Sequence, residues 1–183
     1  ASNPAGVTVE CVGDVPAPDV SVVTDAADNC TAIPTVFFVS DISDGNTCPE
    51  TITRTYSVTD DCGNETNVIQ AITINDITPP TASNPPNINI PLAPVPVPDI
   101  TVITDAADNC TASPIVAFVS DQSDGGDCPE VITRIYSVTD DCGNETLVTQ
   151  LIVIGGGQVP VPTVTANGPI CEGEDAVFTI DGL

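Results

Sequence analysis

The stretch Tyr56-Ser-Val-Thr-Asp-Asp-Cys-Gly-Asn-Glu-Thr66 occurs a second time, without a single change, as Tyr136 to Thr146. Working outward from it, residues 19–74 align with residues 99–154 at an offset of 80, and 41 of the 56 aligned positions are identical. A unit of this length is the size of one small domain. The sequence therefore predicts two tandem copies of one domain.

The boundaries of the copies follow from where the similarity begins and ends. We predict a first domain over residues 1–79 and a second over residues 82–155. Residues 159–183 match neither copy and contain two short strand-like stretches, too few to bury a core. We therefore expect residues 159–183 to be the start of a truncated domain, and the chain to be a segment of a longer polypeptide.

Each copy carries β-strand signals and no helical periodicity. In the first copy, residues 7–12, 20–23 and 52–58 alternate, while residues 35–39 and 68–74 are apolar and rich in β-formers. Asp, Asn, Gly and Pro fill the intervals, as they do in turns. Five strands per copy predict an all-β fold of tandem immunoglobulin-like β-sandwich repeats.

One strand reveals its buried face by what changes between the copies. Ile52, Tyr56 and Val58 recur unchanged, whereas two threonines on the opposite face become Val131 and Ile135. We expect the unchanged face to point into the core.

The charge balance excludes several classes of protein. The chain has 26 acidic and 2 basic residues, a net charge of −24, and no His. It lacks the cations that bind nucleic-acid phosphates or anionic membranes, and no apolar run reaches the ~18–20 residues of a membrane span. We expect no nucleic-acid partner and no direct membrane insertion. Arg54 and Arg134 should each pair with a carboxylate such as Glu50 or a loop aspartate.

Catalysis is also not expected. Without His or Lys, only paired carboxylates could do acid–base chemistry. Those carboxylates recur in both copies, which suits a spacer better than an active site. The sequence predicts that the chain is not an enzyme.

Eight cysteines indicate disulfides and an oxidising, extracellular compartment. If successive strands reverse direction, Cys11 and Cys48 lie at one end of the first domain, and Cys30 and Cys62 lie at the other. Bridges would then form within each domain. The predicted pairs are Cys11–Cys48, Cys30–Cys62 and Cys110–Cys142.

The second copy lacks one cysteine. Leu92 stands where the first copy has Cys11, so the prediction leaves Cys128 unpaired. Cys171 should pair with a cysteine outside this sequence or stay free.

Carboxylates cluster in the loops that carry the cysteines and in the linker after the first copy. Such crowding should be repulsive unless a cation binds, and Ca²⁺ prefers six to eight oxygen ligands of this type. We expect Ca²⁺ to stiffen the junction between the copies; the alternative is a solvated acidic surface in which Asp and Asn merely favour turns. The candidate calcium ligands are Asp25, Asp28, Asp60, Asp61, Asp76, Asp105, Asp108, Asp140 and Asp141.

These motifs carry a family resemblance. Thr24-Asp-Ala-Ala-Asp-Asn-Cys30, Gly45-Asn-Thr-Cys-Pro-Glu50, Thr59-Asp-Asp-Cys-Gly-Asn64 and Ile77-Thr-Pro-Pro80 resemble the hyalin-repeat (HYR-like) modules of giant Bacteroidetes surface proteins. Residues 159–183 are similar to the PKD/immunoglobulin-like modules that alternate with them. The resemblance implies an immunoglobulin-like fold, export across the outer membrane, roles such as that of the gliding-motility adhesin, and no catalytic residues.

The sequence and the resemblance together predict a structural and adhesive segment of a long, disulfide-bonded, calcium-stiffened bacterial cell-surface adhesin filament. We expect it to be extracellular and anchored to the outer membrane through regions outside this segment. The expected partners are neighbouring repeats of the same chain, a surface polysaccharide or other extracellular substrate, and laterally associated copies. The alternative is a calcium-dependent carbohydrate-binding module of a secreted protein.

Overall fold

The structure is a computed structural model that describes residues 1–91, 94–126 and 129–155. The chain divides into two compact units. Unit 1 contains Ala1–Pro79 together with two loops of the second copy, Asp108–Ser113 and Asp140–Asn144. Unit 2 contains Pro80–Ala107, Pro114–Thr139 and the described residues from Glu145 onward.

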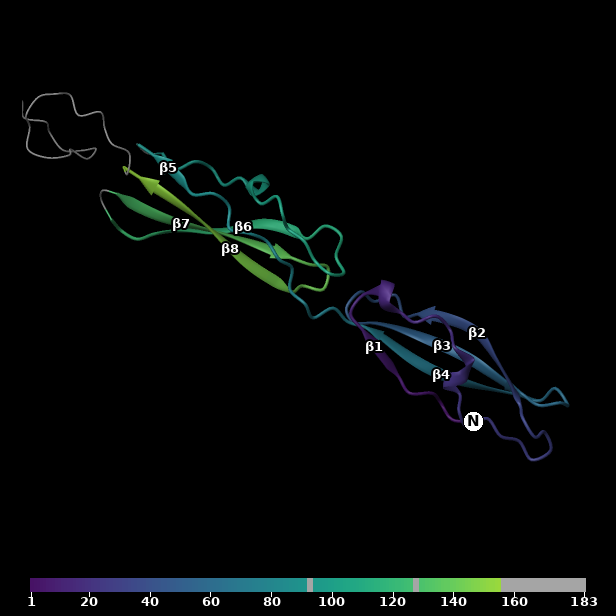
Figure 1. The fold of residues 1–183 in the computed structure, drawn as a ribbon. Helices are drawn as coiled ribbons and strands as arrows, with labels where there is room; N and C mark the ends of the chain where they lie inside the picture. The colour runs from purple at the N-terminus through teal and green to yellow at the C-terminus, as the bar shows by residue number, and fades with distance from the viewer. Residues whose placement is uncertain (92–93, 127–128, 156–183) are drawn as a thin grey trace, which may run out of the picture. The chain divides into compact units, whose positions relative to one another are not determined.

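Each copy folds into one four-stranded sheet (Figure 1). The strands of the first are β1 (Val7–Val9), β2 (Thr35–Ser43), β3 (Glu50–Thr59) and β4 (Glu65–Ile74). Those of the second are β5 (Ile88–Ile90), β6 (Ile115–Ser123), β7 (Glu130–Thr139) and β8 (Glu145–Ile154). The orders β1-β4-β3-β2 and β5-β8-β7-β6 are equivalent, with only the short first strand parallel to its neighbour. The all-β prediction is confirmed, and the two sheets are consistent with tandem immunoglobulin-like β-sandwich domains.

The predicted strand at residues 20–23 is absent from the described structure, and a 3₁₀ turn, η2 (Val20–Val22), takes its place. The Asp19 carboxylate accepts a hydrogen bond from the Ser21 N–H (2.9 Å), which caps this turn. Two further 3₁₀ turns, η1 (Val12–Asp14) and η3 (Ile100–Val102), are the remaining helical elements of the described residues. None of these helices is long enough to cross a membrane.

The core of each copy centres on a tyrosine of the central strand. In the first, Tyr56 is fully buried among Val23, Val58 and Val68. The predicted inward face is confirmed for Tyr56 and Val58, while Ile52 is half-buried. In the second, the same arrangement recurs around a fully buried Tyr136.

Strand register defines two ends of the first sheet. At one end, the last residue of β1 and the first of β3 both pair with Ile74, so the neighbouring Cys11 and Cys48 lie there. At the other end, the start of β2 pairs with Thr59 and the β3–β4 turn carries Cys62. The cysteines therefore lie at the two ends where strand alternation predicts them.

Candidate functional site

Two disulfides join the first copy to loops of the second, and all four of their cysteines belong to unit 1. Cys11 bonds to Cys110 and Cys48 bonds to Cys142, with Cα–Cα distances of 5.1 and 5.3 Å. Both distances lie in the ordinary range for a disulfide. The bridged cysteines are 99 and 94 positions apart in the sequence, which is more than the offset of 80 residues between the two copies.

This corrects the predicted pairing. The bridges Cys11–Cys48, Cys30–Cys62 and Cys110–Cys142 are replaced by two that run from one copy to the next. Cys30 and Cys62 are exposed and unbonded within the described residues. The prediction placed each cysteine at its end of the sheet but assumed that every pair closes within one copy. The predictions for Leu92, Cys128 and Cys171 lie outside the described residues.

The bonded loops of the second copy have close counterparts in the first. We call residues 28–33 and 60–64 the first loop pair, and Asp108–Ser113 and Asp140–Asn144 the second loop pair. Their sequences differ at one position, where Ile33 is replaced by Ser113. Both loop pairs belong to unit 1. Near-identical loops of the two copies therefore lie in different surroundings.

Most predicted calcium ligands are used to hold these loops. Asp28 Oδ2 accepts hydrogen bonds from the N–H groups of Thr31 and Cys30, both at 2.8 Å. The Thr31 bond, followed by the Cys30 bond, lowers the pKa of Asp28. Asp108 makes the equivalent bonds to Cys110 and Thr111. These carboxylates fix the backbone on which the first cysteine of each pair sits.

A second aspartate shapes each β-turn. Asp60 accepts from the N–H groups of Cys62 and Asn64 (2.9 and 2.8 Å) and from Asn64 Nδ2 (2.6 Å), and the Asn64 bonds lower its pKa. Asp140 makes the same three bonds in the second copy. Burial opposes ionisation of Asp140, yet the bonds from Asn144 and Cys142 outweigh it and lower the pKa.

The remaining loop aspartates have similar local roles. Asp25 accepts from the N–H and hydroxyl of Ser2, which lower its pKa, and Asp105 does likewise with Ser83. Asp61 and Asp141 are exposed, and their backbone N–H groups bond to threonine hydroxyls. The structure does not bring these four side chains together as one ligand set.

Asp76 and Asp108 are different, because they approach each other within unit 1. One carboxylate oxygen of each, together with the sulfur of Cys110, lie within 4.8 Å of one another. Asp76 is only 4% exposed. Asp76 Oδ2 and Asp108 Oδ1 are both buried without a hydrogen-bond donor from the described residues. Since Cys110 is disulfide-bonded, the two carboxylates are the oxygen donors available to a cation.

The linker after β4 makes defined contacts in both units. In unit 1, Asn144 Nδ2 donates to the backbone carbonyl of Asp76 (3.0 Å). In unit 2, the Thr146 hydroxyl donates to the Pro80 carbonyl (2.5 Å), and Pro80 is fully buried. Next to it, Thr81 and Ala107 exchange two backbone hydrogen bonds of 2.7 and 2.9 Å. The linker is thus hydrogen-bonded at Asp76 within unit 1 and at Pro80 and Thr81 within unit 2.

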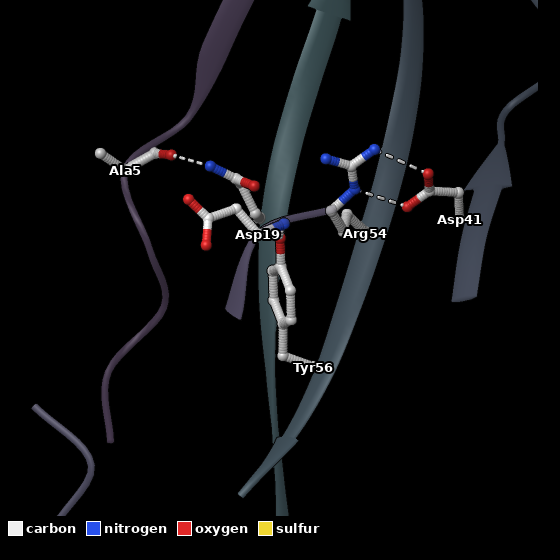
Figure 2. A network of polar contacts seen from close by, with 6 residues as sticks. Ala5, Asp19, Asp41, Arg54 and Tyr56 are labelled. Carbon is white, nitrogen blue, oxygen red and sulfur yellow. Dashed lines mark hydrogen bonds and ion pairs between the residues drawn. The ribbon is translucent and has the colours of Figure 1, made fainter. Parts of the chain in front are cut away.

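The two arginines form internal ion pairs. Arg54 is 2% exposed, and its Nε and Nη2 bind both Asp41 oxygens at 2.8 Å (Figure 2). These hydrogen bonds, which Arg54 donates to the Asp41 carboxylate, raise the pKa of Arg54. The predicted pairing with a carboxylate is confirmed, and the partner is Asp41, which lies in β2 and not in a loop. Arg134 repeats this pair with Asp121. Each ion pair joins two neighbouring strands of its sheet. The carboxylate compensates the charge of the buried guanidinium.

Figure 2 also shows how irregular segments attach to the sheet beside this ion pair. The Asp19 N–H donates to the Tyr56 hydroxyl (3.3 Å), and Gln70 Nε2 donates to the Ala5 carbonyl (2.9 Å).

Sequence reasoning missed three features of the site: Asn144, Thr146 and the pairing of cysteines between copies. A signal was present for the first two. Both lie in the stretch from Tyr136 to Thr146, which repeats Tyr56 to Thr66 without a change.

Comparison with known families gives one finding for this region. Residues 1–74 match the family model described as an HYR-like domain with 4 cysteines. The match covers the first copy and supports an HYR-like module there, as the resemblance implied. No curated protein matches the chain. Together with the disulfides, the match indicates an extracellular, adhesion-type module.

Proposed function

We propose that this chain is a structural and adhesive segment of a long bacterial cell-surface filament, in which successive HYR-like modules are locked to one another by paired disulfides. In this proposal the filament belongs to a Bacteroidetes adhesin, serves surface attachment or gliding motility, and is anchored to the outer membrane through other regions. The segment bears load and has no enzymatic activity.

The observation that carries this proposal is the pair of bridges Cys11–Cys110 and Cys48–Cys142. A bridge within a module would stabilise that module alone. Two bridges from one module to the next also carry tension across the linker, because force can pass through covalent sulfur bonds. That property suits a filament that must stay extended and intact under load.

Pulling on single molecules of the full chain tests this proposal. With both bridges intact, the shortest covalent path runs from Cys11 to Cys110 and along the chain to Cys142. The maximal extension should then be about 300 Å, rising to about 650 Å after reduction. Bridges closed within each module would give about 400 Å before reduction. An oxidised extension near 400 Å would contradict the proposal.

Calcium is a second part of the proposed function. A cation between Asp76 and Asp108 would neutralise two carboxylates that are buried without donors among the described residues. Extracellular modules bind Ca²⁺ with dissociation constants of about 10⁻⁴–10⁻³ M. At ten times that constant, binding would stabilise the folded state by about 1.4 kcal/mol.

Thermal unfolding with calcium and with chelator tests this part. The Tm of the chain should rise with calcium, and Asp76→Asn should abolish the rise. Asp28→Asn is the matched control, because Asp28 is the counterpart of Asp108 in the first copy and should leave the response intact. A chain whose Tm ignores calcium, or an Asp76→Asn variant that still responds, would contradict the site.

The same geometry argues against calcium-dependent carbohydrate binding at this place. A cation that ligates a sugar must keep coordination positions open to solvent. Asp76 is buried, so a cation held by it would have little access to an extracellular glycan.

A further inference from the structure

The two loop pairs have the same internal hydrogen bonds. In each, an aspartate accepts from the N–H groups of the first cysteine and the threonine after it, and another aspartate accepts from the N–H of the second cysteine. In each, that threonine's hydroxyl accepts from the backbone N–H before the second cysteine, at 3.0 Å. The backbone that presents the cysteines is therefore held by the same bonds in both copies.

The two loop pairs differ in what their cysteine sulfurs and asparagine amides bind. In the second loop pair, Cys110 and Cys142 are bonded to cysteines of the first copy, and the Asn144 amide binds the linker carbonyl of Asp76. In the first loop pair, Cys30 and Cys62 are exposed and have no disulfide partner in the described part of the chain.

A hollow of about 120 Å³ lies beside the first loop pair, and its lining includes Ala27, Asp60, Asn64 and Thr66. Their counterparts in the second copy are engaged with the linker or covered. Ala107 bonds to Thr81, Thr146 bonds to Pro80, Asn144 bonds to Asp76, and Asp140 is only 4% exposed. The hollow thus presents the polar groups that bind the linker in the second copy.

We propose that the first loop pair and this hollow form a docking site for the end of another module of the same kind. The occupant would bring two cysteines at the places of Cys11 and Cys48, and a linker like Asp76-Ile-Thr-Pro-Pro-Thr81. Its first cysteine bonds to Cys30 and its second to Cys62. This inference rests on the proposed function and deepens it by naming the partner and the residues that receive it.

Forming each bridge oxidises two thiols, and a disulfide such as oxidised glutathione is the oxidant. A thiolate attacks the oxidant, forms a mixed disulfide and releases one reduced thiol. The partner thiol then attacks the mixed disulfide, forms the inter-module bond and releases the second reduced thiol. Two electrons and two protons pass to the oxidant for each bridge.

The test extends the full chain by one module. A second copy of residues 1–81 is placed directly before Ala1, because Ala82 of the second copy corresponds to Ala1 of the first. The added copy carries Val12→Ile and Thr47→Ser, both at exposed positions, so that its Cys11 and Cys48 peptides differ in mass from those of the original chain. It also carries Cys30→Ser and Cys62→Ser, so that it adds no free thiols of its own. The protein is refolded with oxidised glutathione, digested without reduction by a protease that cuts before Asp, and mapped. Cleavage before Asp leaves Cys62 and Cys142 on peptides of different sequence.

The expected map joins Cys11 of the added copy to Cys30 and Cys48 of the added copy to Cys62. A Cys30–Cys62 bridge in the original chain, or a Cys30 and a Cys62 of the original chain that both still react with maleimide, would overturn the docking site. The same digest reports Cys11–Cys110: if that bridge is missing, the proposed function fails, and if it is present while Cys30 and Cys62 stay free, only this inference fails.

A matched variant checks specificity. With Cys11→Leu in the added copy, as the natural sequence has Leu92 at the equivalent place, Cys30 of the original chain should react with maleimide while Cys62 of the original chain stays bonded. Loss of reactivity at Cys30 in this variant would show that its partner is another cysteine and would contradict the proposal.

Discussion

The first and second loop pairs have nearly the same sequence and the same internal hydrogen bonds, yet their cysteines have different fates. Cys110 and Cys142 are bonded to the first copy, while Cys30 and Cys62 are exposed and unbonded in the described residues. The difference follows from what lies next to each loop pair and not from the loops themselves. A single sequence motif can therefore be a finished junction in one place and a receiving surface in another.

The largest difference between the two loop pairs should be in the stability lost when a cysteine is replaced. Cys142→Ser breaks a link between residues 94 positions apart and should destabilise unit 1 by about 2–5 kcal/mol. Cys62→Ser, the same change in the first loop pair, should leave the free energy of unfolding of this chain unchanged. Denaturant unfolding of the oxidised proteins measures both. Equal losses would mean that Cys62 is also bridged, contrary to the comparison.

Acid should weaken both loop pairs through their turn aspartates. The pKa values of Asp60 and Asp140 are lowered in the folded chain, so their stabilisation is complete above the unfolded value of 3.8 and is lost as pH falls through the folded value. In an Asp60→Asn/Asp140→Asn variant, the amide keeps an acceptor oxygen but does not titrate. Its Tm should fall less between pH 6 and pH 3 than that of the parent chain; an equal fall would rule out these carboxylates as the cause.

Truncating the turn asparagine should also distinguish the copies. Asn144→Ala removes the hydrogen bonds that the amide donates to Asp140 Oδ2 and to the Asp76 carbonyl. Asn64→Ala removes only the hydrogen bond to Asp60 Oδ2. The Tm should therefore fall further for Asn144→Ala. Thermal unfolding at pH 7 provides the measurement, and a larger fall for Asn64→Ala would contradict the assigned roles.

The smallest effect comes from one hydroxyl. Thr146→Val deletes the hydrogen bond to Pro80 and should cost about 1 kcal/mol, because one neutral hydrogen bond is worth roughly that amount. Thr66→Val should be neutral, since Thr66 lies beside the hollow and is exposed. Denaturant unfolding of both variants suffices, and a matching loss in Thr66→Val would mean that the hollow is already filled in this chain.

The sequence predicted the parts of the fold that depend on local pattern. Alternation around Tyr56 located the central strand and its buried face, and the repeat located the two sheets. It missed η2, where Asp19 caps a 3₁₀ turn, because four residues are too few to distinguish the two-residue period of a strand from the three-residue period of that turn.

The disulfide pairing could not be predicted in the same way. Strand direction determines the end of the sheet at which a cysteine lies, and that inference succeeded for Cys11 and Cys62. It does not determine whether the partner belongs to the same module or to the next one. The hydrogen bonds from backbone N–H groups to Asp28 and Asp60 could not be predicted either. In a sequence, loop aspartates that bind backbone N–H groups look the same as loop aspartates that bind a metal.

A disulfide map of the chain itself decides whether the bridges run between the copies. It is made without reduction by a protease that cuts before Asp, because cleavage at both Asp and Glu would release Cys62 and Cys142 on the same peptide, Cys-Gly-Asn-Glu. We expect the peptide pairs Cys11–Cys110 and Cys48–Cys142, with Cys30 and Cys62 modified by maleimide before unfolding. Recovery of Cys11–Cys48 together with Cys110–Cys142 would show that each module closes on itself and would contradict the account.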